Sequence, residues 1–190
     1  MNKWTQYSKD KIDYTGKIFQ IVKRPMICGT KKTDFEIARR TPGVRVIIVN
    51  KNKMLINHEF RTEINGFDYR LPAGKVFDNL ENYASAIKNN DVLVKHAKRA
   101  AIKECLEETG IKVQNIELLQ KAHAGTTIEW DLYYFIVDEF EVSESGQQLE
   151  HGEVIKPVWK TFDEIKEMCL NGQIKEDRTV GVLLKFILNI

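Results

Sequence analysis

The sequence predicts a mixed α/β domain, and three observations support this prediction. Strand-like segments come first, one long helix follows, and further strands and two C-terminal helices complete the chain, an order unlike repeating βαβ units. A hydrophobic content of 43% over 190 residues is enough for one domain with its own core. The apolar segments 44–50 and 53–60 follow each other closely and are typical of a β-hairpin.

The first part of the chain contains only predicted strands. They cover residues 17–24, 34–40 and the hairpin, with a turn at 29–32. A short strand at 68–71 ends at Pro72 and Gly74. We assign residues 1–42 to a small N-terminal β subdomain and residues 43–190 to the main domain.

The second part of the chain alternates between helices and strands. Residues 75–91 are ambiguous between a helical turn and a break, whereas residues 92–109 form the clearest helix. Three strands and two helices are predicted after it, at 113–124, 131–142, 153–160, 161–172 and 177–189. Thr161, followed three residues later by Glu164, is a capping-box pattern at the start of one of these helices.

Composition excludes several classes of protein. The 29 basic and 27 acidic residues leave a net charge of +2, which gives no strong attraction to nucleic acid or to a membrane. The longest apolar run, 44–49, is far too short to span a membrane, and the polar N-terminus lacks the apolar core of a signal peptide. Cys28, Cys105 and Cys169 form no Cys-x-x-Cys pair, which indicates reduced thiols and no zinc site. We therefore expect a cytoplasmic protein.

Three glutamates are crowded at the end of the clearest helix. At about 100° per residue, Glu107 and Glu108 lie about 60° and 40° to either side of Glu104, so all three share one face. Glu104 and Glu108 form a like-charge i,i+4 pair. Gly110 is expected just past the helix end, where the helix dipole also disfavours anions. The like-charge repulsion and the unfavourable helix dipole both make carboxylates costly at this helix end. Together they indicate a compensating cation.

These glutamates belong to a longer pattern. The segment KECLEETGI resembles the second half of the Nudix box, with Lys103 in the usual place of Arg and Cys105 in an apolar position. RLPAGK at 70–75 and HEFR at 58–61 resemble motifs of the branch that contains ADP-ribose and ADP-sugar pyrophosphatases. Segments 122–135 and 150–159 resemble two loops of the same branch. The chain is thus identified as a member of the Nudix superfamily, which implies an α/β/α sandwich with a mixed sheet.

One departure from the family pattern concerns the first half of the box. The consensus places its Gly 14 positions before the Arg, whereas Gly74 lies 29 positions before Lys103 (103 − 74), so about 15 residues are extra. Counting forward from Gly74 places the first consensus Glu on Leu80, and counting back from Lys103 places it on Lys95. We expect an insertion at about 78–95, which the fold tolerates because loop closure costs little extra entropy.

The resemblance implies a set of metal ligands. Glutamate clusters suit hard cations such as Mg²⁺ or Mn²⁺, which prefer oxygen ligands. The expected ligands are the carboxylates of Glu104, Glu107 and Glu108, with Glu108 at a solvent-facing position, and the carbonyl of Ala73. Without the flanking motifs, an EETG segment would more commonly be a solvated helix end.

Further residues follow from the same resemblance. Arg61 is expected to bind phosphate, because a guanidinium matches phosphate oxygens in a bidentate way. Glu153 is the expected general base or water-orienting group, although Glu150 is close in sequence. Substrate contacts are also expected from Arg70, which stands where the branch more commonly has Glu, and from the loop residues Gly125 and Glu129.

The expected activity is Mg²⁺-dependent hydrolysis of a nucleoside diphosphate sugar, with ADP-ribose as the leading substrate and AMP and ribose 5-phosphate as products. The resemblance also implies a homodimer in which the N-terminal strands contribute to the partner's site. Other substrates are a GDP-sugar, a dinucleoside polyphosphate or a modified nucleoside triphosphate. A different class remains open, in which a non-catalytic Nudix domain binds a nucleotide as a sensor. No nucleic-acid or membrane partner is expected.

Overall fold

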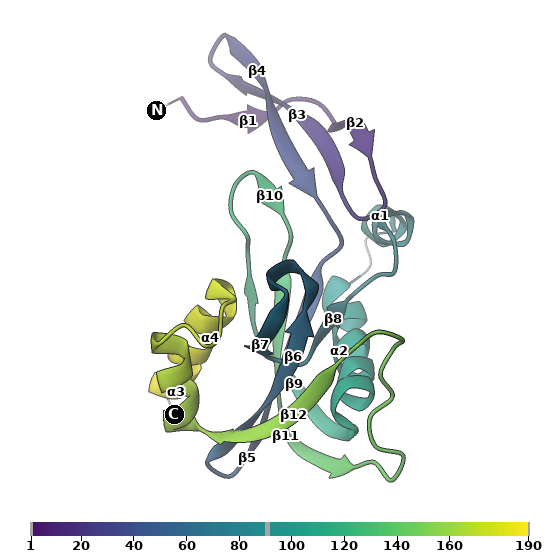
Figure 1. Cartoon of the computed structure of the whole chain (residues 1–190). Coiled ribbons are helices and arrows are strands. Elements are labelled where there is room, and N and C mark those ends of the chain that lie inside the picture. The colour runs from purple at the N-terminus through teal and green to yellow at the C-terminus, as the bar shows by residue number, and fades with distance from the viewer. Residues whose placement is uncertain (1, 90–91, 190) are drawn as a thin grey trace.

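The computed structural model describes residues 2–89 and 92–189 (Figure 1). The strands of this part of the chain are β1 (Thr5–Gln6), β2 (Lys11–Thr15), β3 (Gln20–Cys28), β4 (Lys31–Arg39), β5 (Gly43–Asn50), β6 (Lys53–Arg61), β7 (Gly66–Arg70), β8 (Ala73–Lys75), β9 (Ile111–Ala122), β10 (Ile128–Glu129), β11 (Leu132–Val142) and β12 (Ile155–Thr161). The helices are α1 (Leu80–Lys88), α2 (Leu93–Thr109), α3 (Phe162–Leu170) and α4 (Asp177–Leu188), with a 3₁₀ turn at Thr62–Ile64.

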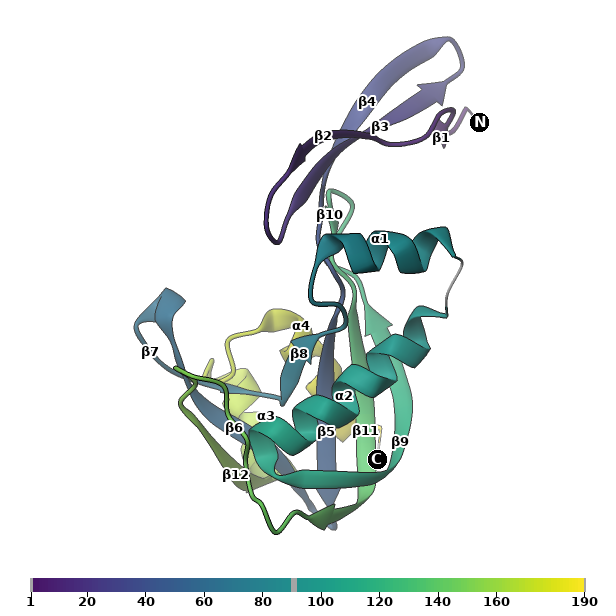
Figure 2. The ribbon, with the colours of Figure 1, turned by 90° about the vertical axis from the view of Figure 1, so that its right-hand side faces the viewer.

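The main sheet is mixed and is covered on both faces. Its strand order is β12-β6-β5-β11-β9, with β7 added to β6 and β8 added to β5, and only β5 and β11 run parallel. Because side chains alternate along a strand, Val44 and Val46 pack on the side of α2, whereas Ile47 packs on the side of α3 and α4. Figure 2 shows α2 on one face of the sheet and α3 and α4 on the other. The predicted α/β/α sandwich is confirmed.

A second sheet extends away from this body. Its strand order is β1-β3-β4-β10, with β2 paired to β3, and Figures 1 and 2 show β1–β4 as an arm beyond the main sheet. Two chain segments run side by side from the arm into the body, because β10 pairs with β4 in parallel. Three backbone hydrogen bonds hold these segments together, from Ala38 N to Thr127 O, from Arg40 N to Glu129 O and from Gly43 N to Asp131 O.

Most predicted elements are present, with shifted ends. The hairpin is β5–β6, and the clearest helix is α2, which ends at Gly110 with a left-handed φ of 69°. The capping box is formed, since Thr161 accepts from Glu164 N and the Glu164 carboxylate accepts from Thr161 N. The short strands β1, β2, β8 and β10 were not predicted.

The expected insertion at 78–95 is not an unstructured loop. It contains α1 and the start of α2, while residues 90 and 91 lie outside the described part of the chain. The helix α1 begins at Asn79, whose side chain accepts from Asn82 N, and it buries Leu80 and Ala86. Figure 2 places α1 between α2 and the arm. None of the helices in the described residues is long and apolar enough to cross a membrane.

Candidate functional site

Glu108 is the most buried of the three helix glutamates. Its side chain lies between α2 and the sheet and is only 6% exposed, so the expected solvent-facing position was wrong. The carboxylate oxygen Oε2 accepts from Asn57 Nδ2 at 2.9 Å and from Ala73 N at 3.0 Å. Burial raises the pKa of Glu108 well above its usual value, although the Ala73 N–H opposes the shift. No hydrogen bond to the other oxygen, Oε1, is formed within the described residues.

Glu104 lies directly against the backbone of β8. A Cβ atom on Gly74 would stand 1.7 Å from Glu104 Oε1, so the absence of a side chain at Gly74 makes room for this carboxylate. Burial raises the pKa of Glu104 to about 7, and the negative charges of Glu107, Glu153 and Glu150 add to the shift. Because a carboxyl group near neutrality loses its proton readily to a competing cation, such a group suits a metal site.

Glu107 points to the more exposed side of the helix. Its carboxylate forms a 2.6 Å ion pair with Lys103 one turn earlier, as the sequence spacing predicts. The carbonyl groups at this helix end are also bonded, since Glu107 O accepts from Gln148 N and Gly110 O accepts from Ser143 N. The loop 143–154 is thereby fastened to the end of α2.

This loop brings a second acidic group to the helix. Glu153 Oε2 accepts from Glu150 N at 2.9 Å, and Val154 O accepts from Phe60 N of β6. The three helix glutamates line one cleft of about 510 Å³ together with Glu150 and Glu153.

The acidic cleft fits a hard divalent cation by its donor chemistry. All of its acidic side chains offer oxygen, the donor that Mg²⁺ and Mn²⁺ prefer, and Ala73 also lines the cleft. No three His, Cys, Asp or Glu side chains within residues 2–89 and 92–189 are arranged as a ready-made metal site. The cleft thus offers oxygen donors of the kind that a divalent cation prefers.

A second cavity adjoins the acidic cleft and is rich in arginine. Its volume is about 210 Å³, and it shares Ala73, Gly74, Lys75 and Glu108 with the cleft. Four arginines also line it, Arg40, Arg45, Arg61 and Arg70. The short strand β8 thus forms a common wall between an acidic space and a basic one.

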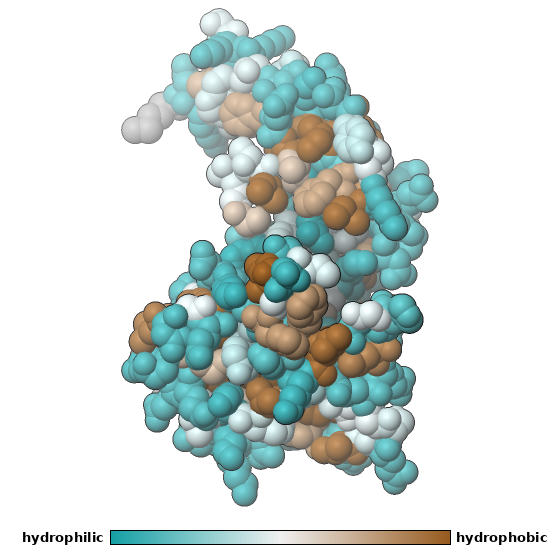
Figure 3. All heavy atoms as spheres, viewed as in Figure 1, coloured by the Kyte–Doolittle hydropathy of each residue, from teal (hydrophilic) through white to brown (hydrophobic). Residues whose placement is uncertain are grey.

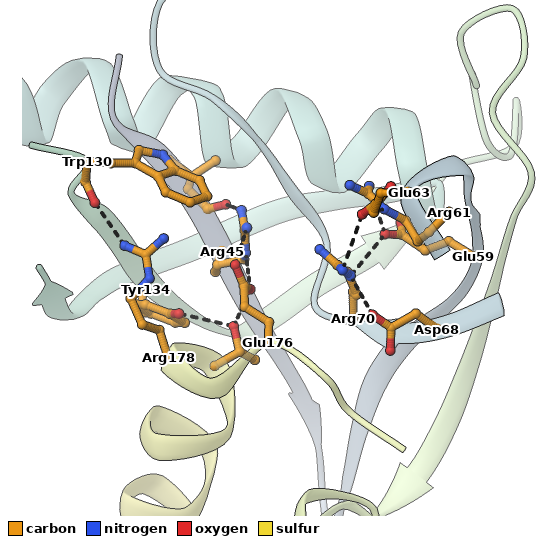
Figure 4. Close-up of polar contacts among 12 residues, drawn as sticks. Arg45, Glu59, Arg61, Glu63, Asp68, Arg70, Trp130, Tyr134, Glu176 and Arg178 are labelled. Atoms are coloured by element: carbon orange, nitrogen blue, oxygen red, sulfur yellow. Dashed lines mark hydrogen bonds and ion pairs between the residues drawn. The ribbon is translucent and has the colours of Figure 1, made fainter. Parts of the chain in front are cut away.

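Most of these arginines are already paired with carboxylates, as Figure 4 shows. Arg61 donates to Glu63 at 2.8 Å and to Glu59 at 3.2 Å. Arg70 donates to Asp68 at 2.8 Å and lies 3.5 Å from Glu63. Arg61, expected to bind phosphate, and Arg70, expected to contact substrate, therefore both line the basic cavity and have carboxylate partners there.

Arg45 is the most buried of the four arginines. It donates two hydrogen bonds to Glu176, at 2.8 and 2.7 Å, in the parallel arrangement that Figure 4 shows. Burial alone would raise the pKa of Glu176, but the bonds from Arg45 lower it to about 2. This pair fastens β5 to the start of α4.

The two expected loop contacts lie elsewhere in this chain. Glu129 in β10 pairs with Arg24 and Arg39 at 2.6 Å each, within the arm, and lines neither cavity. Gly125 precedes β10, has a φ of 142° and faces open space. Their substrate contacts remain a prediction.

Sequence reasoning missed two residues of this site. Asn57 is fully buried and holds Glu108, and its side chain faces α2 from the same side of β6 as Leu55. A polar residue at a core-facing position of a strand was a usable signal, because burying an amide requires a partner. Arg40 was not singled out either. It follows Arg39 directly, and the alternation of side chains along a strand does not tell which of these two arginines faces a cavity.

Comparisons with known proteins agree with this geometry. A family model described as a NUDIX domain matches residues 39–179. Among solved structures 219 chains match, including a crystal structure of an ADP compounds hydrolase with a TM-score of 0.67 and 14% identity, which covers 95% of this chain and 90% of that one. At this identity the match supports the fold alone. No curated protein matches the chain in sequence.

The contact between Gly74 and Glu104 gives a test of the acidic cleft. In Gly74→Ala the new Cβ would overlap the Glu104 carboxylate, which must move away because the backbone cannot. We expect Mn²⁺ affinity to fall by about tenfold or more, the size of change typical for a disturbed ligand shell. Isothermal titration calorimetry measures it.

The matched control is Gly181→Ala, where an added Cβ meets no atom within 4 Å. It should leave Mn²⁺ affinity unchanged, and both variants should keep the circular dichroism spectrum of the parent. Equal Mn²⁺ binding by Gly74→Ala and the parent would contradict the assignment of Glu104 as a ligand.

Proposed function

The chain belongs to the Nudix family, and from that premise we propose that it hydrolyses the pyrophosphate linkage of a nucleoside diphosphate sugar. ADP-ribose is the leading substrate, with AMP and ribose 5-phosphate as products, and Mg²⁺ or Mn²⁺ is the cofactor. One observation carries the proposal: the acidic cleft and the basic cavity share β8 and Glu108. A pyrophosphate linkage next to a metal site requires both kinds of environment.

The proposed division of labour follows from the positions of the side chains. Glu104, Glu107, Glu108 and the Ala73 carbonyl would hold the metal, which when bound neutralises phosphate charge and lowers the pKa of water. Asn57 and Ala73 N–H keep the Glu108 carboxylate in place. Arg61 and Arg70 orient the phosphates from the basic cavity.

Glu153 is the proposed group that accepts the proton of the attacking water. It lies in the same cleft as the helix glutamates, on a loop fastened to both α2 and β6. Its carboxylate holds only one hydrogen bond, from Glu150 N, among the described residues. Glu150 lines the cleft as well and is the alternative acceptor.

Two other functions compete with this proposal. A GDP-sugar, a dinucleoside polyphosphate or a modified nucleoside triphosphate would use the same acidic cleft, since the chemistry at phosphorus is unchanged. A nucleotide sensor without catalysis would explain the interrupted Nudix box, where α1 occupies the inserted residues. The clustered carboxylates argue against the sensor, because like charges are costly without a cation.

A substrate panel tests the proposed function. Phosphate or AMP release is measured for ADP-ribose, GDP-mannose, diadenosine polyphosphates and nucleoside triphosphates, each with Mg²⁺ and with chelator. We expect Mg²⁺-dependent cleavage, fastest for ADP-ribose. Faster cleavage of another compound would change the substrate, and no cleavage alongside ligand-induced thermal stabilisation would favour the sensor.

Removing one carboxylate charge tests the catalytic assignment. Glu108→Gln should lower kcat by roughly 100-fold or more, the cost of losing one group that stabilises transition-state charge. The fold should persist, because the new amide oxygen can accept the bonds from Asn57 and Ala73. The control Glu117→Gln removes the same charge from an exposed position on β9 and should retain parental kcat. Parental turnover in Glu108→Gln would refute the role of Glu108.

We also propose that the chain forms a homodimer through residues 1–42 and that the arm reaches the partner's site. Large apolar side chains are exposed on the arm, namely Trp4, Tyr7, Ile12, Tyr14, Ile18, Phe19 and Phe35. Figure 3 shows apolar side chains among the polar ones on the arm and at its junction with the body. Such a group of exposed apolar residues is typical of an interface.

The dimer is tested by charging the arm. Ile12→Lys combined with Tyr14→Lys should shift the sedimentation coefficient from that of a dimer to that of a monomer, because two ammonium groups would be buried without partners. Val142→Lys is the control, since Val142 is more exposed still and lies at the end of β11. A parent protein that sediments as a monomer at micromolar concentration would refute the dimer.

A further inference from the structure

The acidic cleft extends well beyond the three helix glutamates. Its lining also includes two residues between the end of β8 and the start of α1 and two near the start of α2, namely Lys75, Asp78, His96 and Arg99. At a rise of 1.5 Å per residue, Arg99 lies roughly 7.5 Å along the helix axis from Glu104. The cleft therefore has an inner end at the glutamates and an outer end beside Arg99, at a separation that one sugar unit can span.

Two cations at the outer end lack an ion-pair partner among the described residues. Lys103 is paired with Glu107. Lys75 and Arg99, in contrast, form no ion pair and no side-chain hydrogen bond within residues 2–89 and 92–189, although Asp78 lines the same cleft. Both side chains are exposed, so water solvates them in the free protein and an anionic ligand can replace that water.

The order of charges along α2 is the reverse of the order that stabilises a helix. The helix dipole favours anions near the first turn and cations near the last turn. In α2 the first turn has no acidic residue and the last turn has no basic residue, while Lys95, Lys98 and Arg99 all lie within the first two turns. Helix stability therefore does not explain this arrangement. A negatively charged ligand group beside the first turns of α2 would make it favourable.

Aromatic packing fixes the position of the outer end. Phe77 is only 9% exposed, and its ring centre lies 5.0 Å from that of His96 in α2 and 5.5 Å from that of Tyr83 in α1. The inserted helix α1 also buries Leu80 and Ala86. The segment between β8 and α1 is thereby held against the start of α2, so the outer end is a fixed part of the fold.

The outer end suits a sugar better than a nucleobase. No Phe, Tyr or Trp among the described residues lines the cleft, so a base would find no such ring on which to stack. The donors of Lys75 and Arg99 and the acceptor oxygens of Asp78 instead match the hydroxyl groups of a sugar. The half of the substrate that lies along α2 is therefore the sugar half.

We propose that Lys75 and Arg99 bind a phosphate group that the sugar half of the substrate carries. This inference rests on the proposed function, which places the pyrophosphate linkage at the glutamates and so directs one half of the substrate along α2. Among nucleoside diphosphate sugars, those whose sugar is itself phosphorylated then bind more tightly than ADP-ribose, which leaves the outer end empty. A phosphate suits the two cations because it carries about two negative charges and because a guanidinium can donate to two of its oxygens.

Binding of two sugar phosphates to the full chain in the presence of Mn²⁺ tests this inference. Ribose 5-phosphate and ribose 1,5-bisphosphate differ only in the phosphate that would reach the outer end. Calorimetric titration of the parent should show that the bisphosphate binds about tenfold more tightly, the typical effect of hydrogen bonds to a charged group. In Arg99→Gln this preference should fall to about threefold or less, because one of the two cations is lost.

Lys98→Gln is the matched control. It removes the same charge from the neighbouring residue of α2, which is also exposed but does not line the cleft. This variant should keep the full preference for the bisphosphate. Both variants should keep the circular dichroism spectrum of the parent, because both substitutions are at exposed helical positions.

The outcomes separate this inference from the proposed function. A parent that binds neither compound or binds both equally, an unchanged preference in Arg99→Gln, or an equal loss in Lys98→Gln would each overturn the phosphate site. Cleavage of ADP-ribose by a parent without the preference would leave the activity intact and refute the site. A preference that Arg99→Gln reduces, in a parent that cleaves no compound, would support the site and refute the activity.

Discussion

The hydrogen bonds to Glu108 are the interaction on which the rest of the site depends. One carboxylate oxygen joins a helix, a central strand and a short edge strand, because it accepts from Asn57 of β6 and from the backbone of Ala73 in β8 while belonging to α2. Those bonds set the distance between α2 and β8, and with it the space in which Glu104 lies against Gly74. A buried carboxylate is costly, and the raised pKa of Glu108 reflects that cost. The fold tolerates it because the backbone N–H and the amide are already oriented toward it.

The same short strand separates two opposite electrostatic environments. On one side of β8 lie acidic groups from α2 and from the loop fastened to its end, and on the other side lie arginines from four different segments. Coulombic attraction would draw these groups together if nothing stood between them. The backbone of β8 keeps them apart, and local partners neutralise most of the arginines. Lys103 likewise neutralises Glu107 on the acidic side, whereas Arg40 in the basic cavity has no carboxylate partner among the described residues.

The sequence predicted the local elements well and the long-range contacts poorly. Periodicity and capping residues were sufficient for α2, for the β5–β6 hairpin and for the capping box at Thr161, because those signals act within a few residues. The strands β8 and β10 are short, and each forms because it pairs with a strand that is distant in sequence, β8 with β5 and β10 with β4. No local sequence pattern reveals such a pairing. For the same reason the sequence singled out the helix glutamates, whose pattern is local, but not Asn57 and Arg40, whose surroundings depend on distant strands. The pairing of Arg61 and Arg70 with carboxylates also depends on the β6–β7 pairing.

The parallel pairing of β4 with β10 connects the arm to the chemistry of the body. Residues 38–40 and 127–130 cross from one sheet to the other as a bonded pair, so the arm cannot move without carrying Arg40 and Trp130 with it. Arg178 of α4 holds the indole from the body side, and the Arg45–Glu176 pair holds α4 to β5. The arm is therefore connected to the basic cavity through a chain of direct contacts. The same few backbone hydrogen bonds therefore join the arm to the wall of the basic cavity.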